Sequence, residues 1–164
     1  MIKKIFFTLL LSLTLITNSH AAGSGDSGGD GAATKSNYDK AVKLIKIAKK
    51  NEKKGKNDKA KSNYEKAFKL LVKSNKKKPN KPDTLNYLGF TSRKLGDFEN
   101  GEKYYLQGLA IDPEHVGINE YLGELYVATN RHNLAVERLG VLESCNCEEY
   151  DQLKAVIAGE KSKY

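Results

Sequence analysis

The sequence lacks the residue sets with which most enzymes carry out their chemistry. It contains no HExxH, GxSxG or phosphate-loop motif and only three histidines. His20 lies in an N-terminal segment that we expect to be removed, His115 is predicted to be a surface residue, and His132 is predicted to pack at the start of a helix. Because no candidate catalytic groups converge, we expect no enzymatic activity, no cofactor and no metal site.

Cysteine is also scarce, since only Cys145 and Cys147 are present, one residue apart in a predicted turn. Thiols usually pair in an oxidising compartment, so one alternative is a disulfide that closes a very small ring. Free thiols or a link to another chain are equally open. A catalytic redox role or a metal role is the third alternative, although a zinc site would need two further ligands. The sequence therefore leaves the redox state of the pair open.

Arginine is absent from residues 38–81, although this segment holds 17 lysines against four acidic residues, a net charge of +13. Residues 82–164 carry a net charge of −6. Without arginine, and without an aromatic binding motif among the lysines, the segment does not indicate nucleic-acid binding. Three alternatives remain: a solvated lysine surface, contact with anionic lipid head groups or cell-wall polymers, and contact with an acidic protein partner or the acidic end of a neighbouring copy.

Long apolar runs are few. Residues 5–16 form an apolar run with two lysines before it and a Ser-His-Ala sequence at 19–21 after it. This order is typical of a cleavable signal peptide, and the run is shorter than the roughly 20 residues that a transmembrane helix needs. We therefore expect a signal peptide at residues 1–21, no transmembrane helix after processing, and a location in a bacterial periplasm. Residues 22–35, rich in Gly, Ser and Asp, are interpreted as a flexible linker.

What the chain does contain is a segment that is followed by its own copy at an offset of 34 in the numbering. Leu85, Leu88, Gly89, Gly101, Tyr105, Gly108 and Pro113 recur as Asn119, Leu122, Gly123, Ala135, Leu139, Leu142 and Cys147. A period of this size is typical of a stacked array of helical repeats. An earlier copy, in residues 44–67, precedes the segment at an offset of 41. The seven extra residues are about two helical turns, so the second helix of the first repeat is predicted to be two turns longer.

The sequence Leu85-x2-Leu88-Gly89, followed by Gly101-x3-Tyr105 and then Pro113, resembles the tetratricopeptide repeat (TPR) pattern W-x2-L-G-x2-Y…A-x3-F…P. The resemblance implies an all-α, TPR-like α-solenoid of helix–turn–helix repeats in residues 36–164. The expected repeats span about 37–80, 82–115 and 116–147. Apolar residues on one face of residues 148–161 predict a C-terminal capping helix.

The resemblance also implies a concave groove lined by the first helix of each repeat. The repeat match transfers this role to Lys49, Glu52, Asn86, Phe90, Arg93, Glu120, Glu124 and Val127, with Ile45 beside them. Phe90 has two alternatives, an exposed anchor for a peptide or packing against the neighbouring repeat. Gly117 and Tyr121 stand where the chaperone-tail-binding subclass carries basic residues, so we do not expect that ligand.

The expected function is that of an exported scaffold that binds a protein or peptide of unknown identity in this groove. The alternative is a cell-envelope structural protein whose Lys-rich first repeat binds an anionic membrane or cell-wall surface.

Overall fold

The computed structural model describes residues 35–163, which form seven α-helices and no strand. The helices are α1 (Asn37–Glu52), α2 (Asn57–Lys77), α3 (Pro82–Lys94), α4 (Phe98–Leu109), α5 (Val116–Ala128), α6 (His132–Leu142) and α7 (Glu148–Ile157). This all-α array of three helix pairs and a last helix confirms the predicted fold class. The predicted signal peptide, and the predicted linker except Lys35, lie outside the described residues. None of the described helices is long and apolar enough to cross a membrane.

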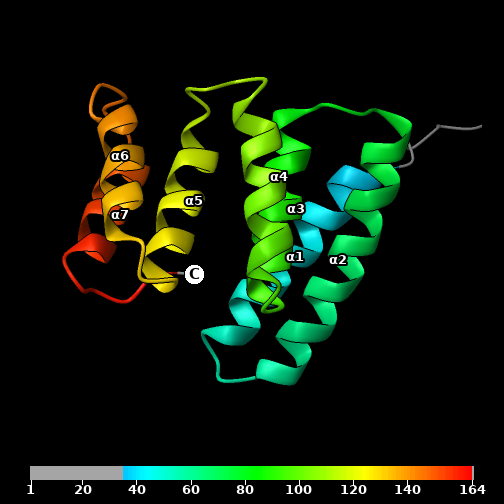
Figure 1. The fold of residues 1–164 in the computed structure, drawn as a ribbon. Coiled ribbons are helices and arrows are strands. Elements are labelled where there is room, and N and C mark those ends of the chain that lie inside the picture. Colours follow the sequence, from blue (N-terminus) through cyan, green and yellow to red (C-terminus); the bar gives the residue numbers. More distant parts are fainter. Residues whose placement is uncertain (1–34, 164) are drawn as a thin grey trace, which may run out of the picture. The chain divides into compact units, whose positions relative to one another are not determined.

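The helices form a stack in which neighbours along the chain pack together (Figure 1). The most extensive contacts are within the pairs α1–α2, α3–α4 and α5–α6. Helix α3 also contacts α1 and α5, and α5 contacts α7. The first helices of the three pairs and α7 therefore form one continuous layer of the array.

The turn inside each pair has the same geometry in all three repeats. Gly55, Gly96 and Asn130 precede the second helix and have φ values of 68°, 85° and 60°. The N–H of the next residue in each turn donates to the carbonyl five residues before it, at N···O distances of 2.9, 2.9 and 2.8 Å. This bond satisfies a carbonyl at the end of the first helix. The numbers of the three turn residues differ by the two repeat offsets seen in the sequence.

Side chains at several helix starts satisfy the free backbone N–H groups there. Ser36 and Asp39 form a capping box at α1, and the Asp97 carboxylate accepts a backbone N–H at α4. At α5 the imidazole of His115 takes this role, because its Nδ1 accepts the Ile118 N–H at 3.2 Å. His115 was predicted to be a surface residue, but its side chain is only 14% exposed because it caps the helix.

Glycines allow close approach between neighbouring helices. A Cβ atom at Gly89 would lie 2.5 Å from the Tyr105 ring, across the helix pair α3–α4. A Cβ atom at Gly123 would lie 2.5 Å from a methyl group of Leu153 in α7. Gly89 therefore brings together the two helices of one repeat, whereas its repeat counterpart Gly123 makes room for the last helix.

The second helix of the first repeat, α2, is extended as predicted. Helix α7, in contrast, ends earlier than predicted. Helix α2 has 21 residues, against 12 in α4 and 11 in α6. Helix α7 ends at Ile157 and not at residue 161. The reason is Gly159, whose φ of 96° lets its own N–H donate to the Val156 carbonyl and the Glu160 N–H donate to the Ala155 carbonyl. This pair of bonds is the Schellman motif that ends a helix.

Two side chains are exposed where packing would be expected, Ile47 from the repeat register and His132 from its predicted place at the start of a helix. Ile47 matches Leu88 in the repeat register, yet it is 40% exposed whereas Leu88 is 1% exposed. Helix α3 packs against the preceding helix α2, whereas no helix precedes α1 within residues 35–163. His132 lies in the first turn of α6 and is exposed. Its counterpart Phe98 is 40% exposed, so this repeat position lies at the surface in both copies.

Candidate partner-binding face

The first helices of the three repeats bring charged and aromatic side chains together. We call this set the first-helix cluster. It consists of Lys49 from α1, Phe90 and Arg93 from α3, and Glu120, Tyr121 and Glu124 from α5. Residues three or four positions apart lie on the same side of a helix, which is why α3 and α5 each contribute a small group.

Phe90 lies at the centre of the cluster and is fully buried. Its ring packs edge-on against Tyr64 at a centroid distance of 5.8 Å and lies tilted against Tyr121 at 5.0 Å. The Lys49 ammonium lies 4.5 Å from the Phe90 ring centroid and donates to the Tyr121 hydroxyl at 3.2 Å. The structure therefore favours the packing alternative for Phe90 and not the exposed anchor.

The cluster also contains charges that are shielded from water. Arg93 Nη2 lies 2.8 Å from Glu124 Oε2, and these side chains are only 9% and 0% exposed. Glu120 is 2% exposed, and its Oε1 has no hydrogen-bond partner among the described residues. Burial, together with the charges of Glu124 and Glu149, raises the pKa of Glu120 to about 8. Burial lowers the pKa of Lys49 to about 8.

Glu120 Oε1 is a buried acceptor atom without a donor among the described residues, and leaving such an atom unpaired is costly. The first-helix cluster can therefore accept hydrogen bonds from N–H or O–H groups of another chain segment. It offers no comparable site for a metal. Within residues 35–163, no group of histidine, cysteine and acidic side chains could hold one.

Three of the predicted groove residues lie outside this cluster. Glu52 accepts the Tyr64 hydroxyl at 2.8 Å and pairs with Lys94 at 2.8 Å, so it links helices α1, α2 and α3. Asn86 is 7% exposed near the start of α5. Val127 is partly buried against the core. Ile45 is 2% exposed and is also a core residue.

Sequence reasoning missed two residues that contact the cluster. Tyr121 had been considered only as a departure from the chaperone-binding pattern. Its register match to Tyr87, one repeat earlier, could have placed it on the same face. Ser162 lies beyond the predicted capping helix of residues 148–161, yet its hydroxyl donates to Glu124 Oε1 at 2.8 Å. A glycine at 159 was the signal that the helix stops before it.

Cys145 and Cys147 form a disulfide in the turn between α6 and α7. Both residues are half-buried, and Asn146 between them has a φ of 51°. The bond lies in the connection that leads the chain from the last repeat into α7. It corresponds to the disulfide alternative for this pair, which the sequence left open.

A lysine-lined cavity lies at the other end of the array. It has a volume of about 540 Å³ and is bounded by the starts of α1 and α3 and the end of α2. Five lysines line it, namely Lys35, Lys40, Lys77, Lys78 and Lys81. Asp83 also lines it and is the one acidic residue among the lining residues described.

Comparisons with known proteins fit this architecture. Residues 83–115, which hold most of α3, all of α4 and the loop that leads to α5, match the tetratricopeptide repeat model. Among solved structures, the chain is similar to the first TPR domain of Spaghetti (RPAP3) bound to the HSP90 peptide SRMEEVD. The sequences are 20% identical and the TM-score is 0.51, with 74% of this chain and 96% of that chain covered. A comparison with curated proteins finds no match.

At this level of identity the structural similarity establishes the fold alone. The fold is a TPR-like helical solenoid, in which one repeat matches the TPR pattern and the flanking pairs share its turn geometry. The matched repeat contributes Phe90 and Arg93 to the first-helix cluster.

Proposed function

We propose that this chain is an exported, non-enzymatic scaffold that binds a linear segment of a protein or peptide partner on the first-helix face. The observation that carries the proposal is the first-helix cluster, in which charged groups are buried but not fully satisfied. Support also comes from the TPR domain of Spaghetti, which is described with a bound peptide.

The chemistry of the cluster favours a partner different from that of Spaghetti. The peptide SRMEEVD is acidic towards its end, and such a ligand needs cations on the face that receives it. Here two buried acidic side chains lie among the cluster residues, Glu120, which is mostly protonated at neutral pH because its pKa is about 8, and Glu124, which pairs with Arg93. A segment that brings hydroxyl or amino groups fits this face better, because these groups donate to carboxylates.

Crosslinking in intact cells tests the proposal. Proteins crosslinked to the wild type would be compared by mass spectrometry with those of Glu120→Gln and Lys49→Met, which change the face with little loss of volume. Lys69→Met, an exposed position on α2, serves as the matched control. We expect one envelope protein to disappear from the lists of both face variants and to remain in that of the control. Identical lists from correctly folded variants would contradict the proposal.

The lysine-lined cavity favours a second candidate function, contact with an anionic membrane or cell-wall polymer. About 1 kcal/mol per lysine is available near a charged surface, and salt screens this attraction. The triple variant Lys40→Glu, Lys77→Glu, Lys81→Glu should lose binding to vesicles that contain anionic lipid. Binding of the wild type should also fall at high salt. Equal binding of the two proteins would exclude this candidate.

Export is part of the same proposal and has its own test. If residues 1–21 are a signal peptide, the protein recovered from the periplasm should begin at Ala22. The intact mass of the recovered protein distinguishes this from an uncleaved chain.

A further inference from the structure

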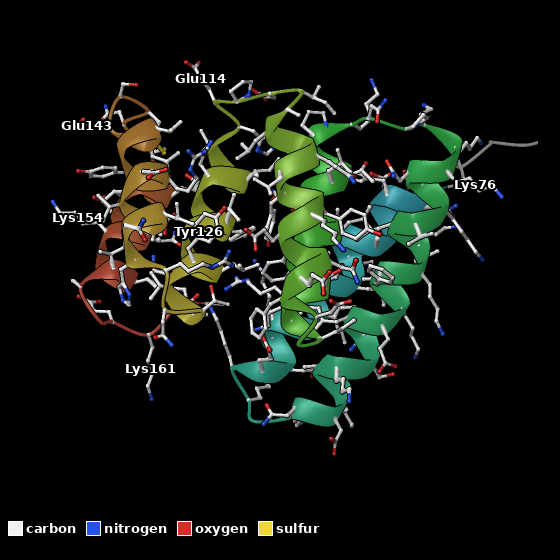
Figure 2. The ribbon with its side chains drawn as sticks, viewed as in Figure 1. Lys76, Glu114, Tyr126, Glu143, Lys154 and Lys161 are labelled. Carbon is white, nitrogen blue, oxygen red and sulfur yellow. A yellow bond between two sulfur atoms is a disulfide. The ribbon has the colours of Figure 1, made fainter. Side chains whose placement is uncertain are left out.

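The residues after α7 turn back towards the first-helix face. Helix α7 ends in a Schellman motif, with Gly159 in the left-handed region of the backbone. The chain can therefore leave the helix axis immediately. Lys161 points away from the helices (Figure 2), whereas Ser162, the next residue, is half-buried. Successive side chains of an extended segment point to opposite sides, so this alternation is what a segment lying across a surface produces.

Ser162 is the residue that joins this segment to the first-helix cluster. Its hydroxyl donates to Glu124 Oε1 at 2.8 Å, and the other oxygen of the same carboxylate pairs with Arg93. Lys163 pairs with Glu148 at 2.8 Å, but both side chains are more than half exposed. Because exposed ion pairs contribute little, the hydrogen bond of Ser162 to the buried Glu124 side chain holds the segment more firmly than the ion pair of Lys163 does.

The segment also matches the chemistry of the face. The first-helix cluster contributes two buried acidic side chains, Glu120 and Glu124, and Glu148 and Glu149 at the start of α7 add two more acidic residues. The segment brings one hydroxyl donor, Ser162, and Lys163, which pairs with Glu148, whereas Lys161 points away from the helices (Figure 2) and its charge is offset in the segment by Glu160. A hydroxyl group followed by a lysine is thus complementary to this face in both hydrogen bonding and charge.

We propose that residues 159–163 are the resident occupant of the first-helix face, held by the Ser162–Glu124 hydrogen bond. An external partner must displace this segment, and the contacts of the segment indicate the partner's chemistry: a short stretch in which a hydroxyl-bearing residue is followed by a lysine. We call this position of residues 159–163 on the first-helix face the seat. The seat is argued from the contacts of Ser162, whereas competition between the segment and a partner rests on the proposed function.

A peptide binding experiment tests the seat. The mature chain is shortened after Ala158, and a fluorescent peptide of residues 159–164, Gly-Glu-Lys-Ser-Lys-Tyr, is added to it and to the unshortened chain. We expect the shortened chain to bind the peptide at least roughly tenfold more tightly than the unshortened chain does, because its face is vacant. Equal binding to both chains, or no binding to a folded shortened chain, would overturn the proposal.

Two peptide variants distinguish the serine contact from general charge attraction. Replacing the serine that corresponds to Ser162 by alanine should weaken binding by roughly tenfold, the usual effect of losing a hydrogen bond to a charged group. Replacing Lys161 by alanine is the matched control, because this side chain points away from the helices (Figure 2). Similar losses from both replacements would overturn the proposed seat.

A second measurement applies if the shortened chain does not fold. Ser162→Ala in the unshortened chain should increase the rate of trypsin cleavage after Lys161, since the segment is then released from the face. Lys154→Ala is the control, because this exposed residue of α7 does not contact the segment in any described interaction. Unchanged cleavage in Ser162→Ala would overturn the seat.

Crosslinking separates this inference from the proposed function. If the peptide binds as expected and neither chain captures a partner in cells, the seat stands and the proposed function fails. If the shortened chain captures more of a partner than the unshortened chain, the competition is supported. Equal capture, together with peptide binding, would overturn the competition.

Discussion

The buried carboxyl group of Glu120 makes the stability of the protein depend on pH in a specific way. Its pKa is about 8 in the folded state, against 4.5 for the free group. The folded state therefore holds one more proton than the unfolded state between these two values. Stability should fall as the pH rises through this window, because the unfolded state is then favoured by losing the proton.

The size of this effect follows from the shift. Each pKa unit corresponds to about 1.4 kcal/mol, so the full shift amounts to about 5 kcal/mol, of which about 3 kcal/mol should appear between pH 5 and pH 8. The groups that face Glu120 are Lys49 on α1, Arg93 on α3, Glu124 on α5 and Glu149 on α7. The pKa of Lys49 is lowered to about 8, so its burial penalty is complete below pH 8 and disappears as the pH rises further. The two groups together predict a stability minimum near pH 8.

Glu120→Gln tests this reasoning, because the amide keeps the shape of the side chain and does not titrate. Urea unfolding at pH 5, 6.5 and 8, followed by circular dichroism, gives the free energy of unfolding for each protein. We expect the wild type to lose stability over this range and the variant to change much less. Glu114→Gln, at an exposed loop position labelled in Figure 2, is the control and should follow the wild type. Parallel curves for wild type and Glu120→Gln would refute the assignment.

Three further substitutions test the packing. Gly123→Ala should cost about 1–3 kcal/mol, because its Cβ would lie 2.5 Å from Leu153. Gly140→Ala is the control, because nothing lies within 4 Å of that position, and it should stabilise α6 by about 0.5–1 kcal/mol. Phe90→Ala should cost about 3–5 kcal/mol in urea unfolding, since the ring is fully buried, and a cost below about 1 kcal/mol would indicate an exposed ring. Gly159→Ala should cost about 1 kcal/mol, because φ is 96° there, and it should speed trypsin cleavage of the residues that follow α7.

The repeated features of the fold could be predicted from the sequence because they depend on local spacing. The two repeat offsets reappear in the structure as the spacings between Gly55, Gly96 and Asn130 in three equivalent turns. The longer α2 follows from the same offsets. Each repeat packs mainly against its neighbours, so a local pattern is enough to specify the stack.

The candidate site was harder to predict, because the burial of a side chain on the first helices depends on which other helices pack against it. The repeat register placed Phe90, Glu120 and Glu124 on the first helices, but it could not show that neighbouring helices would bury them. The exposure of Ile47 also depends on the neighbouring helices. Its counterpart Leu88 lies on α3, which follows α2, whereas no helix precedes α1 within residues 35–163. The Ser162 contact joins a residue beyond the last repeat to α5, so no periodic pattern could reveal it.

Each of the three equivalent turns depends on the stereochemistry of a single residue, the one with a positive φ. Asn130 adopts the same positive φ that glycine adopts at 55 and 96. Each turn therefore requires a left-handed backbone conformation and not a particular side chain. An L-residue with a Cβ atom loses about 1–2 kcal/mol when it adopts this geometry, whereas a D-residue prefers it. Chemical synthesis with D-alanine at any of the three positions should therefore preserve the stack that L-alanine would weaken. The same left-handed backbone conformation, used at three positions along the chain, thus joins the two helices of each repeat in the same way.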